Sequence, residues 1–152
     1  MKKENITSSA NQTKKLAEKI ARKIIKKEPE TNAFVIGLKG DLGGGKTTFV
    51  QGFARGLGIK EKILSPTFVI YKKFKILNYK LPTINYKLFY HFDCYRIKNS
   101  KEILGLGFKE IISNPQNIVV IEWADKIKKI MPKNTFWISF DFINESTRKI
   151  TL

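Results

Sequence analysis

The spacing of hydrophobic residues near the N-terminus is that of a helix. Between residues 16 and 25, apolar side chains recur every three or four positions, which places them on one helical face. The segment Ser9 to Gln12 has the form of a capping box. Further on, Glu28-Pro29-Glu30 contains a proline, which removes a backbone donor and restricts the residue before it. We therefore predict a helix over residues 10–27.

Residues 33–38 form a short, mainly apolar run that predicts a central strand buried on both faces. A glycine-rich loop follows this run directly. Residues 47–57 then have the apolar spacing of a helix, with Gly58 just past its end. The sequence thus predicts a strand, a glycine-rich loop and a helix in immediate succession.

The remaining hydrophobic segments are short. We predict strands at residues 68–74, 88–92 and 118–121, and edge strands at residues 136–143 and 148–152. We predict helical segments at residues 102–112, interrupted by Gly105 and Gly107, and at residues 124–130, with a hairpin or long loop at residues 75–87. No internal repeat or Gly/Ser-rich linker divides the chain. These patterns predict a single α/β domain over residues 1–152.

The formal net charge of +16 raises the question of a nucleic-acid partner, because a dense basic surface binds phosphate backbones by releasing counterions. Only four of the 29 basic residues are arginines, and the lysines are scattered over helical and extended segments. This distribution indicates a bias of the whole composition more than a dedicated RNA groove. No apolar run approaches the roughly 18 residues that span a bilayer, so we expect a cytoplasmic protein without membrane contact.

Residues Gly40 to Thr47 match the pattern Gly-x-x-x-x-Gly-Lys-Thr of a phosphate-binding loop. Its glycines let backbone N–H groups curl around an anion, and the helix that follows presents further N–H groups to it. Lys46 is expected to reach the β- and γ-phosphates of ATP, and the Thr47 hydroxyl to ligate Mg²⁺. The alternative is a glycine-rich turn without a ligand. The predicted nucleotide-binding residues of the loop are Leu42, Gly43, Gly44, Gly45, Lys46, Thr47 and Thr48.

Two acidic residues follow predicted strands at the edge where an open α/β sheet binds ligands. Asp93 follows the strand at residues 88–92, and Glu122 follows the strand at residues 118–121. Either carboxylate could be the acid near the metal that hydrolysis requires, the alternative being a strand-end carboxylate that caps a helix. Thr67 could contact the γ-phosphate or the metal, the alternative being a plain Ser-Pro-Thr turn.

Three other side chains have both a functional and a structural interpretation. His91 could tune Asp93 or be a satisfied structural histidine. Arg96 could stabilise the developing phosphate charge as an arginine finger or pair with a nearby acid. Trp123 could stack beside a nucleotide base or pack in the core.

Four motifs occur in the order and near the spacing of one known family: Gly40 to Phe49, Ser65 to Phe68, His91 to Arg96 and Ile121 to Ala124. Over most of its length the chain resembles the bacterial tRNA threonylcarbamoyladenosine biosynthesis ATPases (TsaE, also called YjeE). The resemblance implies a P-loop NTPase fold with a mixed, mainly parallel central sheet flanked by helices. It also implies Mg²⁺-dependent ATP hydrolysis that is slow in isolation.

Such a protein acts with two partner proteins of the sugar-kinase-like fold. The partners would transfer a threonylcarbamoyl group to the adenosine next to the tRNA anticodon, and this chain would meet tRNA only indirectly or weakly. Under the same resemblance, Lys46, Asp93 and Glu122 would serve ATP hydrolysis. Thr47 and Glu122 would hold Mg²⁺, and Trp123 would lie beside the nucleotide.

The resemblance further implies that the segment around Ser9 and Thr13 approaches the adenine. The chain departs from the family pattern at Gly44, where alanine is usual, and over residues 72–87, which are longer and richer in lysine than usual. Cys94 replaces a common apolar residue and is expected to be a small buried hydrophobe.

Two other functions share a phosphate-binding loop. A small P-loop kinase needs an arginine-rich lid over the acceptor phosphate, and the four arginines of this chain stand singly. A nucleotide-dependent switch protein is the second alternative. The chain has no Asn-Lys-x-Asp guanine signature, which favours ATP over GTP.

Overall fold

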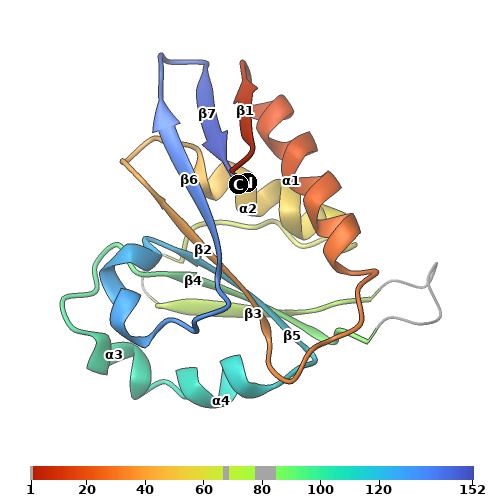
Figure 1. The fold of residues 1–152 in the computed structure, drawn as a ribbon, viewed down its shortest axis with the longest axis vertical. Coiled ribbons are helices and arrows are strands. Elements are labelled where there is room, and N and C mark those ends of the chain that lie inside the picture. The colour runs from red at the N-terminus through yellow and green to blue at the C-terminus, as the bar shows by residue number, and fades with distance from the viewer. Residues whose placement is uncertain (1, 67–68, 78–84) are drawn as a thin grey trace.

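The computed structural model describes residues 2–66, 69–77 and 85–152 and contains a seven-stranded sheet. The strands are β1 (Glu4–Thr7), β2 (Phe34–Gly40), β3 (Tyr71–Lys75), β4 (Leu88–Asp93), β5 (Asn117–Glu122), β6 (Phe136–Phe142) and β7 (Arg148–Thr151). Their order in the sheet is β1-β7-β6-β2-β5-β4-β3 (Figure 1). The central strands β6, β2, β5 and β4 are parallel, whereas the pairs β1–β7, β7–β6 and β4–β3 are antiparallel. The predicted α/β fold with a mixed, mainly parallel central sheet is confirmed.

Helices cover both faces of the sheet, and the described residues form two hydrophobic cores. The helices are α1 (Ala10–Ile24), α2 (Lys46–Gly56), α3 (Ser100–Leu104), α4 (Phe108–Ser113) and the 3₁₀ helix η1 (Ala124–Ile130). One core joins α1 and α2 to the sheet, and the other joins α3, α4 and η1 to its opposite face. In β5, Ile118 and Val120 belong to the first core, while Val119 and Ile121 belong to the second. This explains why the central strands have continuous apolar runs.

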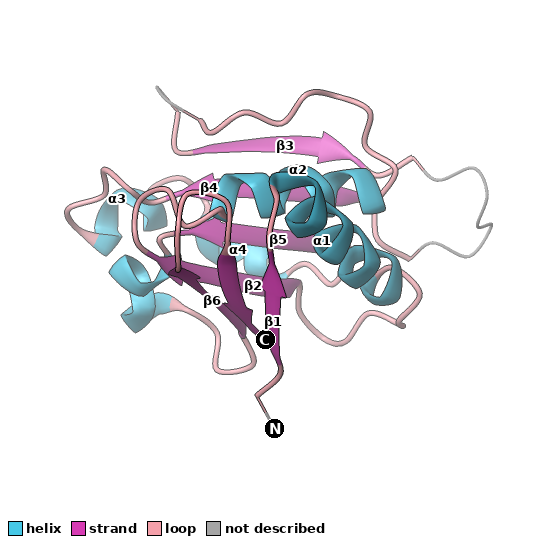
Figure 2. Ribbon diagram, turned by 90° about the horizontal axis from the view of Figure 1, so that it is seen from above, coloured by secondary structure: helices cyan, strands magenta, loops and turns pink. Residues whose placement is uncertain are grey.

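The prediction that residues 136–143 and 148–152 form edge strands is wrong. β6 lies between β7 and β2, and β7 is covered by β1, which pairs with it from Glu4 to Thr7. β1 has four residues, and only Thr7 is buried. It therefore has no apolar pattern that could have predicted it. The outermost strands are β1 and β3, on opposite sides of the sheet (Figure 2).

The helix boundaries differ from the predictions by a few residues. α1 ends at Ile24, not at residue 27, and the Lys27 N–H closes a turn onto the Ile24 carbonyl oxygen. The predicted helical segment at residues 102–112 is two short helices, α3 and α4, separated by the predicted glycine break. Most of the predicted hairpin at residues 75–87 lies outside the described residues.

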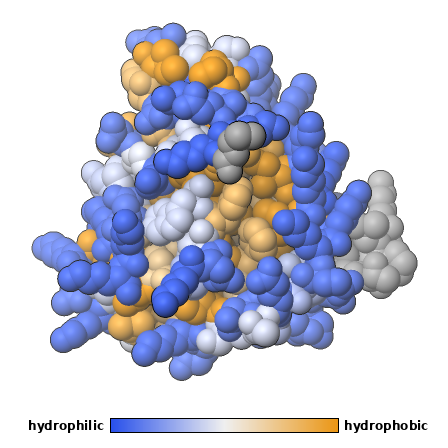
Figure 3. Space-filling model, in the orientation of Figure 1, coloured by the Kyte–Doolittle hydropathy of each residue, from blue (hydrophilic) through white to orange (hydrophobic). Residues whose placement is uncertain are grey.

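Hydrophilic residues cover most of the face seen in Figure 3, and apolar residues show between them. Cys94 is buried, as expected, and burial raises the pKa of its thiol to about 12. Within the described part of the chain, no helix is both long and apolar enough to cross a membrane.

The contact between α1 and α2 depends on two glycines four residues apart. A Cβ added to Gly52 would lie 2.3 Å from the Lys14 carbonyl oxygen, and one added to Gly56 would lie 2.6 Å from the Glu18 carbonyl oxygen. The backbones of the two helices therefore approach too closely for any side chain at these positions. This packing fixes the direction of α2 and of the loop that begins it.

We expect Gly52→Ala to lower the free energy of unfolding by about 2 kcal/mol, because forced overpacking outweighs the helix propensity of alanine. Gly105→Ala is the control, since a methyl group there would meet its nearest atom, the Lys101 carbonyl oxygen, at 3.6 Å. Denaturant unfolding of both variants measures the difference. Equal stabilities would contradict the close-packing interpretation.

Candidate functional site

The glycine-rich loop joins β2 to α2 in a shape that only glycines allow at two positions. Gly40 has a φ of 142°, and a Cβ on it would lie 2.4 Å from the Phe140 carbonyl oxygen. Gly45 has a φ of 94° and is the N-cap of α2. The first N–H groups of α2 have no partners within the helix, so they and the helix dipole favour an anion in front of the loop.

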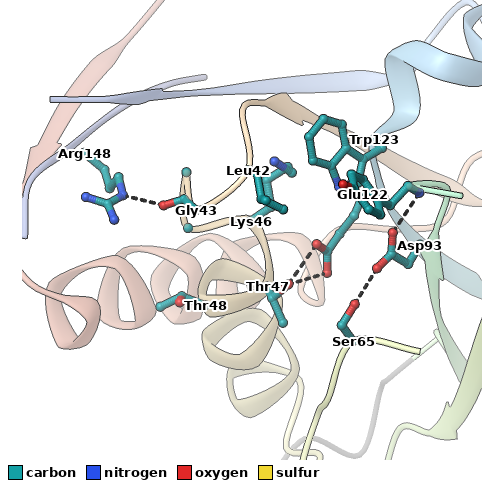
Figure 4. A pocket seen from close by; sticks show the side chains of 13 residues that line it. Leu42, Gly43, Lys46, Thr47, Thr48, Ser65, Asp93, Glu122, Trp123 and Arg148 are labelled. Atoms are coloured by element: carbon teal, nitrogen blue, oxygen red, sulfur yellow. Dashed lines mark hydrogen bonds between the residues drawn. The ribbon is translucent and has the colours of Figure 1, made fainter. Parts of the chain in front are cut away.

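A cavity of about 320 Å³ lies along this loop (Figure 4). Its lining includes ten residues that the sequence predicted: Leu42, Gly43, Gly44, Gly45, Lys46, Thr47, Thr48, Asp93, Glu122 and Trp123. Three further residues, Ser65, Tyr95 and Arg148, were not predicted. The predicted residue Thr67 lies outside the described residues. The structure thus brings together side chains from β4, β5, β7 and the loop.

Lys46 is nearly buried and lies against the loop itself. Its Nζ donates hydrogen bonds to the carbonyl oxygens of Gly40, at 2.6 Å, and Asp41, at 2.8 Å. The ammonium group also lies 3.9 Å from the centre of the Trp123 ring, in a cation–π contact. Burial lowers the pKa of Lys46 below its ordinary value, while nearby carboxylates, Glu122 foremost, oppose this shift. A phosphate in the cavity would favour the charged form in the same way as these carboxylates do.

Glu122 is the acid that reaches the loop. It is 2% exposed, and its two carboxylate oxygens lie 2.9 Å and 3.1 Å from the Thr47 hydroxyl, which donates to them. Hydroxyl and carboxylate oxygens are the ligands that Mg²⁺ prefers, with phosphate oxygens and water completing an octahedron. The chemistry of Thr47 and Glu122 therefore fits this cation, and their role as its ligands stays a prediction.

Asp93 is beside Glu122 because the two residues are direct partners in the parallel pair β4–β5. Its Oδ1 accepts a hydrogen bond from the Tyr95 N–H at 2.9 Å, and its Oδ2 accepts one from the Ser65 hydroxyl. The contact with Ser65 ties the segment after α2 to the carboxylate. Asp93 thus lies at the cavity without contacting the loop threonine, unlike Glu122.

Trp123 has a φ of 56°, the one positive value among the described residues other than glycine. For a bulky residue this left-handed conformation costs about 1–3 kcal/mol and persists only where the surroundings impose it. Its ring lies 5.0 Å from the ring of Tyr95 and against Lys46. Trp123 therefore lines the cavity and also packs against the second hydrophobic core, and its predicted position beside a nucleotide stays a prediction.

The two other candidates lie differently from what the sequence suggested. His91 Nε2 is 2.8 Å from Glu122 Oε1, so the histidine contacts Glu122 and not Asp93. Arg96 does not line the cavity at the loop. It lines an adjoining cavity of about 540 Å³, which shares Asp93 with the first. The predicted role of Arg96 as an arginine finger therefore stays a prediction.

Arg148 is the arginine at the loop. Its Nε donates to the Gly43 carbonyl oxygen at 3.0 Å, and its guanidinium group lies 4.7 Å from the centre of the Phe142 ring. It belongs to no ion pair between described residues. Figure 4 shows it at the end of the cavity away from Asp93. Because Arg148 and Gly43 are 105 positions apart in the sequence, no local pattern could have indicated this contact.

The segment expected near the adenine has other contacts. Ser9 caps α1 by accepting a hydrogen bond from the Gln12 N–H at 3.2 Å. Thr13 is buried, and its hydroxyl is 2.8 Å from that of Thr7. Neither residue lines the cavity at the loop, so their predicted approach to the adenine stays a prediction.

Comparison with known proteins identifies the family of this chain. Residues 7–150 match the family model of the threonylcarbamoyl adenosine biosynthesis protein TsaE. The tRNA threonylcarbamoyladenosine biosynthesis protein TsaE of Haemophilus influenzae is 30% identical over 87% of this chain and 77% of that protein. The protein of the same name from Bacillus subtilis is 38% identical over 77% of this chain and 67% of its own. The crystal structure of Bacillus subtilis YdiB superposes with a TM-score of 0.74 at 30% identity, covering 99% of this chain and 84% of that one.

The position of Arg148 predicts that it contributes to nucleotide binding, and Arg96 offers a matched control. We expect Arg148→Ala to weaken binding of a nucleoside triphosphate about tenfold, because a charged hydrogen bond to phosphate is lost. Arg96→Ala removes the same charge outside this cavity and should leave the affinity within about twofold. Titration calorimetry of both variants decides the matter. An equal loss in the two would mean that net charge, not position, is responsible.

Proposed function

Because the chain belongs to the TsaE family of tRNA threonylcarbamoyladenosine biosynthesis proteins, we propose that it is the subunit that binds and hydrolyses ATP in this modification. The observation that carries the proposal is the hydrogen-bonded pair of Thr47 and Glu122 at the mouth of a glycine-rich loop. In the proposal, residues 1–152 act as one P-loop domain. ATP occupies the cavity with its phosphates on the loop.

Four groups of this chain bind the phosphates. The loop N–H groups and the N-terminus of α2 supply partial positive charge. Lys46 exchanges its two carbonyl partners for β- and γ-phosphate oxygens, since its flexible side chain already ends beside the loop. Arg148 supplies a second cation at the other end of the cavity. Trp123 covers the nucleotide from the side of β5.

The two acids have separate tasks. Glu122 and the Thr47 hydroxyl would hold Mg²⁺, directly or through water, and the bound ion would supply positive charge to the transferred phosphoryl group. Asp93, at the next strand end, orients the attacking water. The two neighbouring carboxylates thus differ in role because Glu122 contacts Thr47 and Asp93 does not.

The partners complete the proposed function. Two proteins of the sugar-kinase-like fold carry the transfer of the threonylcarbamoyl group to the adenosine next to the anticodon, and turnover of ATP by this chain resets their complex. Contact with tRNA is indirect or weak, and the complex works in the cytoplasm. The alternatives, a small kinase and a switch protein, gain no support from the cavity, whose lining includes Arg148 as its one arginine among the described residues.

Lys46→Ala tests the proposal in cells. We expect it to lower the kcat/KM for ATP at least about 100-fold, the scale of losing one transition-state donor. In a strain without its own ATPase of this family, the variant should then fail to restore threonylcarbamoyladenosine in tRNA, measured by mass spectrometry of nucleosides. Lys109→Ala is the matched control because this lysine is exposed on α4. Full restoration by Lys46→Ala would sink the site assignment.

Replacing each carboxylate side chain by the corresponding amide distinguishes the proposed roles of Glu122 and Asp93. In the proposed site, Mg²⁺ increases the affinity for ATP. We expect Glu122→Gln to reduce this increase by about tenfold, because a neutral amide holds the ion poorly. Asp93→Asn should bind ATP with Mg²⁺ almost normally but hydrolyse it about 100-fold more slowly. Titrations with and without Mg²⁺, combined with single-turnover rates, measure both effects. The roles would have to be reversed if Asp93→Asn lost the Mg²⁺-dependent gain.

A further inference from the structure

The single histidine has no task in the steps above, yet its position is fully buried. His91 is 0% exposed and lies on β4, two residues before Asp93. We propose that His91 is a positioning residue for Glu122: it holds one carboxylate oxygen so that the other stays directed at Thr47 and the metal ion. This inference rests on the proposed function, because it concerns the same carboxylate.

The strand register brings the two residues together. His91 is the direct partner of Val120 on the parallel strand β5, so Glu122 lies two residues further along the same face. Nε2 of the ring is 2.8 Å from Glu122 Oε1. An ionised carboxylate can only accept a hydrogen bond, so Nε2 carries the proton and donates it. A charge-assisted hydrogen bond of this kind is stronger than one between neutral groups.

The two carboxylate oxygens are thereby made unequal. Oε1 faces both His91, at 2.8 Å, and the Thr47 hydroxyl, at 3.1 Å. Oε2 is closer to the Thr47 hydroxyl, at 2.9 Å, and the hydrogen bond of His91 goes to Oε1 instead. The ring thus anchors Oε1 from the interior, and Oε2 keeps a lone pair for the ion or its water.

The surroundings of the other ring nitrogen indicate that packing alone does not explain why a histidine lies at this position. His91 Nδ1 is buried and has no hydrogen-bond partner among the residues that the structure describes. A side chain that only filled this space would be apolar, since a buried polar atom without a partner is unfavourable. Among the described residues, the one hydrogen bond of the ring is with Glu122. The hydrogen bond of Nε2 to Glu122 therefore explains why an imidazole lies at this position.

Outer partners of this kind commonly change metal affinity by about 10–100-fold when they are removed. The reason is geometric. Without the ring, the Glu122 side chain can rotate within its pocket, and binding the ion must then include the cost of fixing it again. The Thr47 hydroxyl does not replace the ring, because in the proposed function it coordinates the ion itself.

The experiment compares His91→Leu with His91→Gln, each as the full-length chain. Leucine fills a similar volume without a donor, whereas the glutamine amide can place an N–H near the position of Nε2. ATP affinity is measured by calorimetry in EDTA and in Mg²⁺. We expect His91→Leu to reduce the Mg²⁺-dependent gain in affinity about tenfold while affinity in EDTA stays unchanged. His91→Gln should restore most of the gain.

A retained gain in His91→Leu would overturn the inference, and so would an equal loss of affinity in EDTA and in Mg²⁺, which would show a merely structural role. If His91→Leu does not fold, His91→Asn replaces it, because the shorter amide falls short of Glu122. Equal gains in the asparagine and glutamine variants would then overturn the inference. A wild-type protein whose ATP affinity ignores Mg²⁺ would instead contradict the metal assignment of the proposed function, and this inference with it.

Discussion

The site depends on the burial of two opposite charges that the fold must compensate. Lys46 is 4% exposed and Glu122 is 2% exposed, and an ionised group removed from water is costly unless neighbouring groups replace its hydration. Lys46 gains two carbonyl oxygens and an aromatic face, and Glu122 gains a hydroxyl and an imidazole. The loop, β4 and β5 must therefore keep their relative positions for either charge to remain stable. A bound phosphate would compensate the charge of Lys46, and a bound metal ion would compensate the charge of Glu122.

The register of the central sheet makes this compensation possible. β2 pairs with β5 so that Leu38 faces Glu122, and β5 pairs with β4 so that Glu122 faces Asp93. β4 and β5 thus end together at the two acids, and β2 runs two residues further, to Gly40, before its loop begins. The close contact of α1 with Gly52 and Gly56 fixes the direction of α2, which follows the loop. A shift of β5 by one residue would turn Glu122 to the opposite face.

Local patterns in the sequence were sufficient to predict those parts of the fold and the site that consist of neighbouring residues. The loop from Gly40 to Thr47 could be predicted because glycine spacing, strand and helix are contiguous, and both acids could be predicted because each ends an apolar strand. β1 could not, since its short polar segment becomes a strand only by pairing with β7. The contacts of Arg148 with Gly43 and of His91 with Glu122 were also missed. They join residues 105 and 31 positions apart, and only the sheet order brings them together.

The surroundings of Asp93 are consistent with the slow hydrolysis in isolation that belongs to the proposed function. Both carboxylate oxygens already accept hydrogen bonds, from the Tyr95 N–H and the Ser65 hydroxyl, so each has less capacity left to orient a water molecule. Ser65 stands in the segment between α2 and β3, and the Tyr95 side chain is 45% exposed beside the cavity. A protein that contacted these two residues would change the hydrogen bonding of Asp93 without touching the loop. In the proposed complex, control of turnover by a partner then requires no rearrangement of the groups that bind the phosphates.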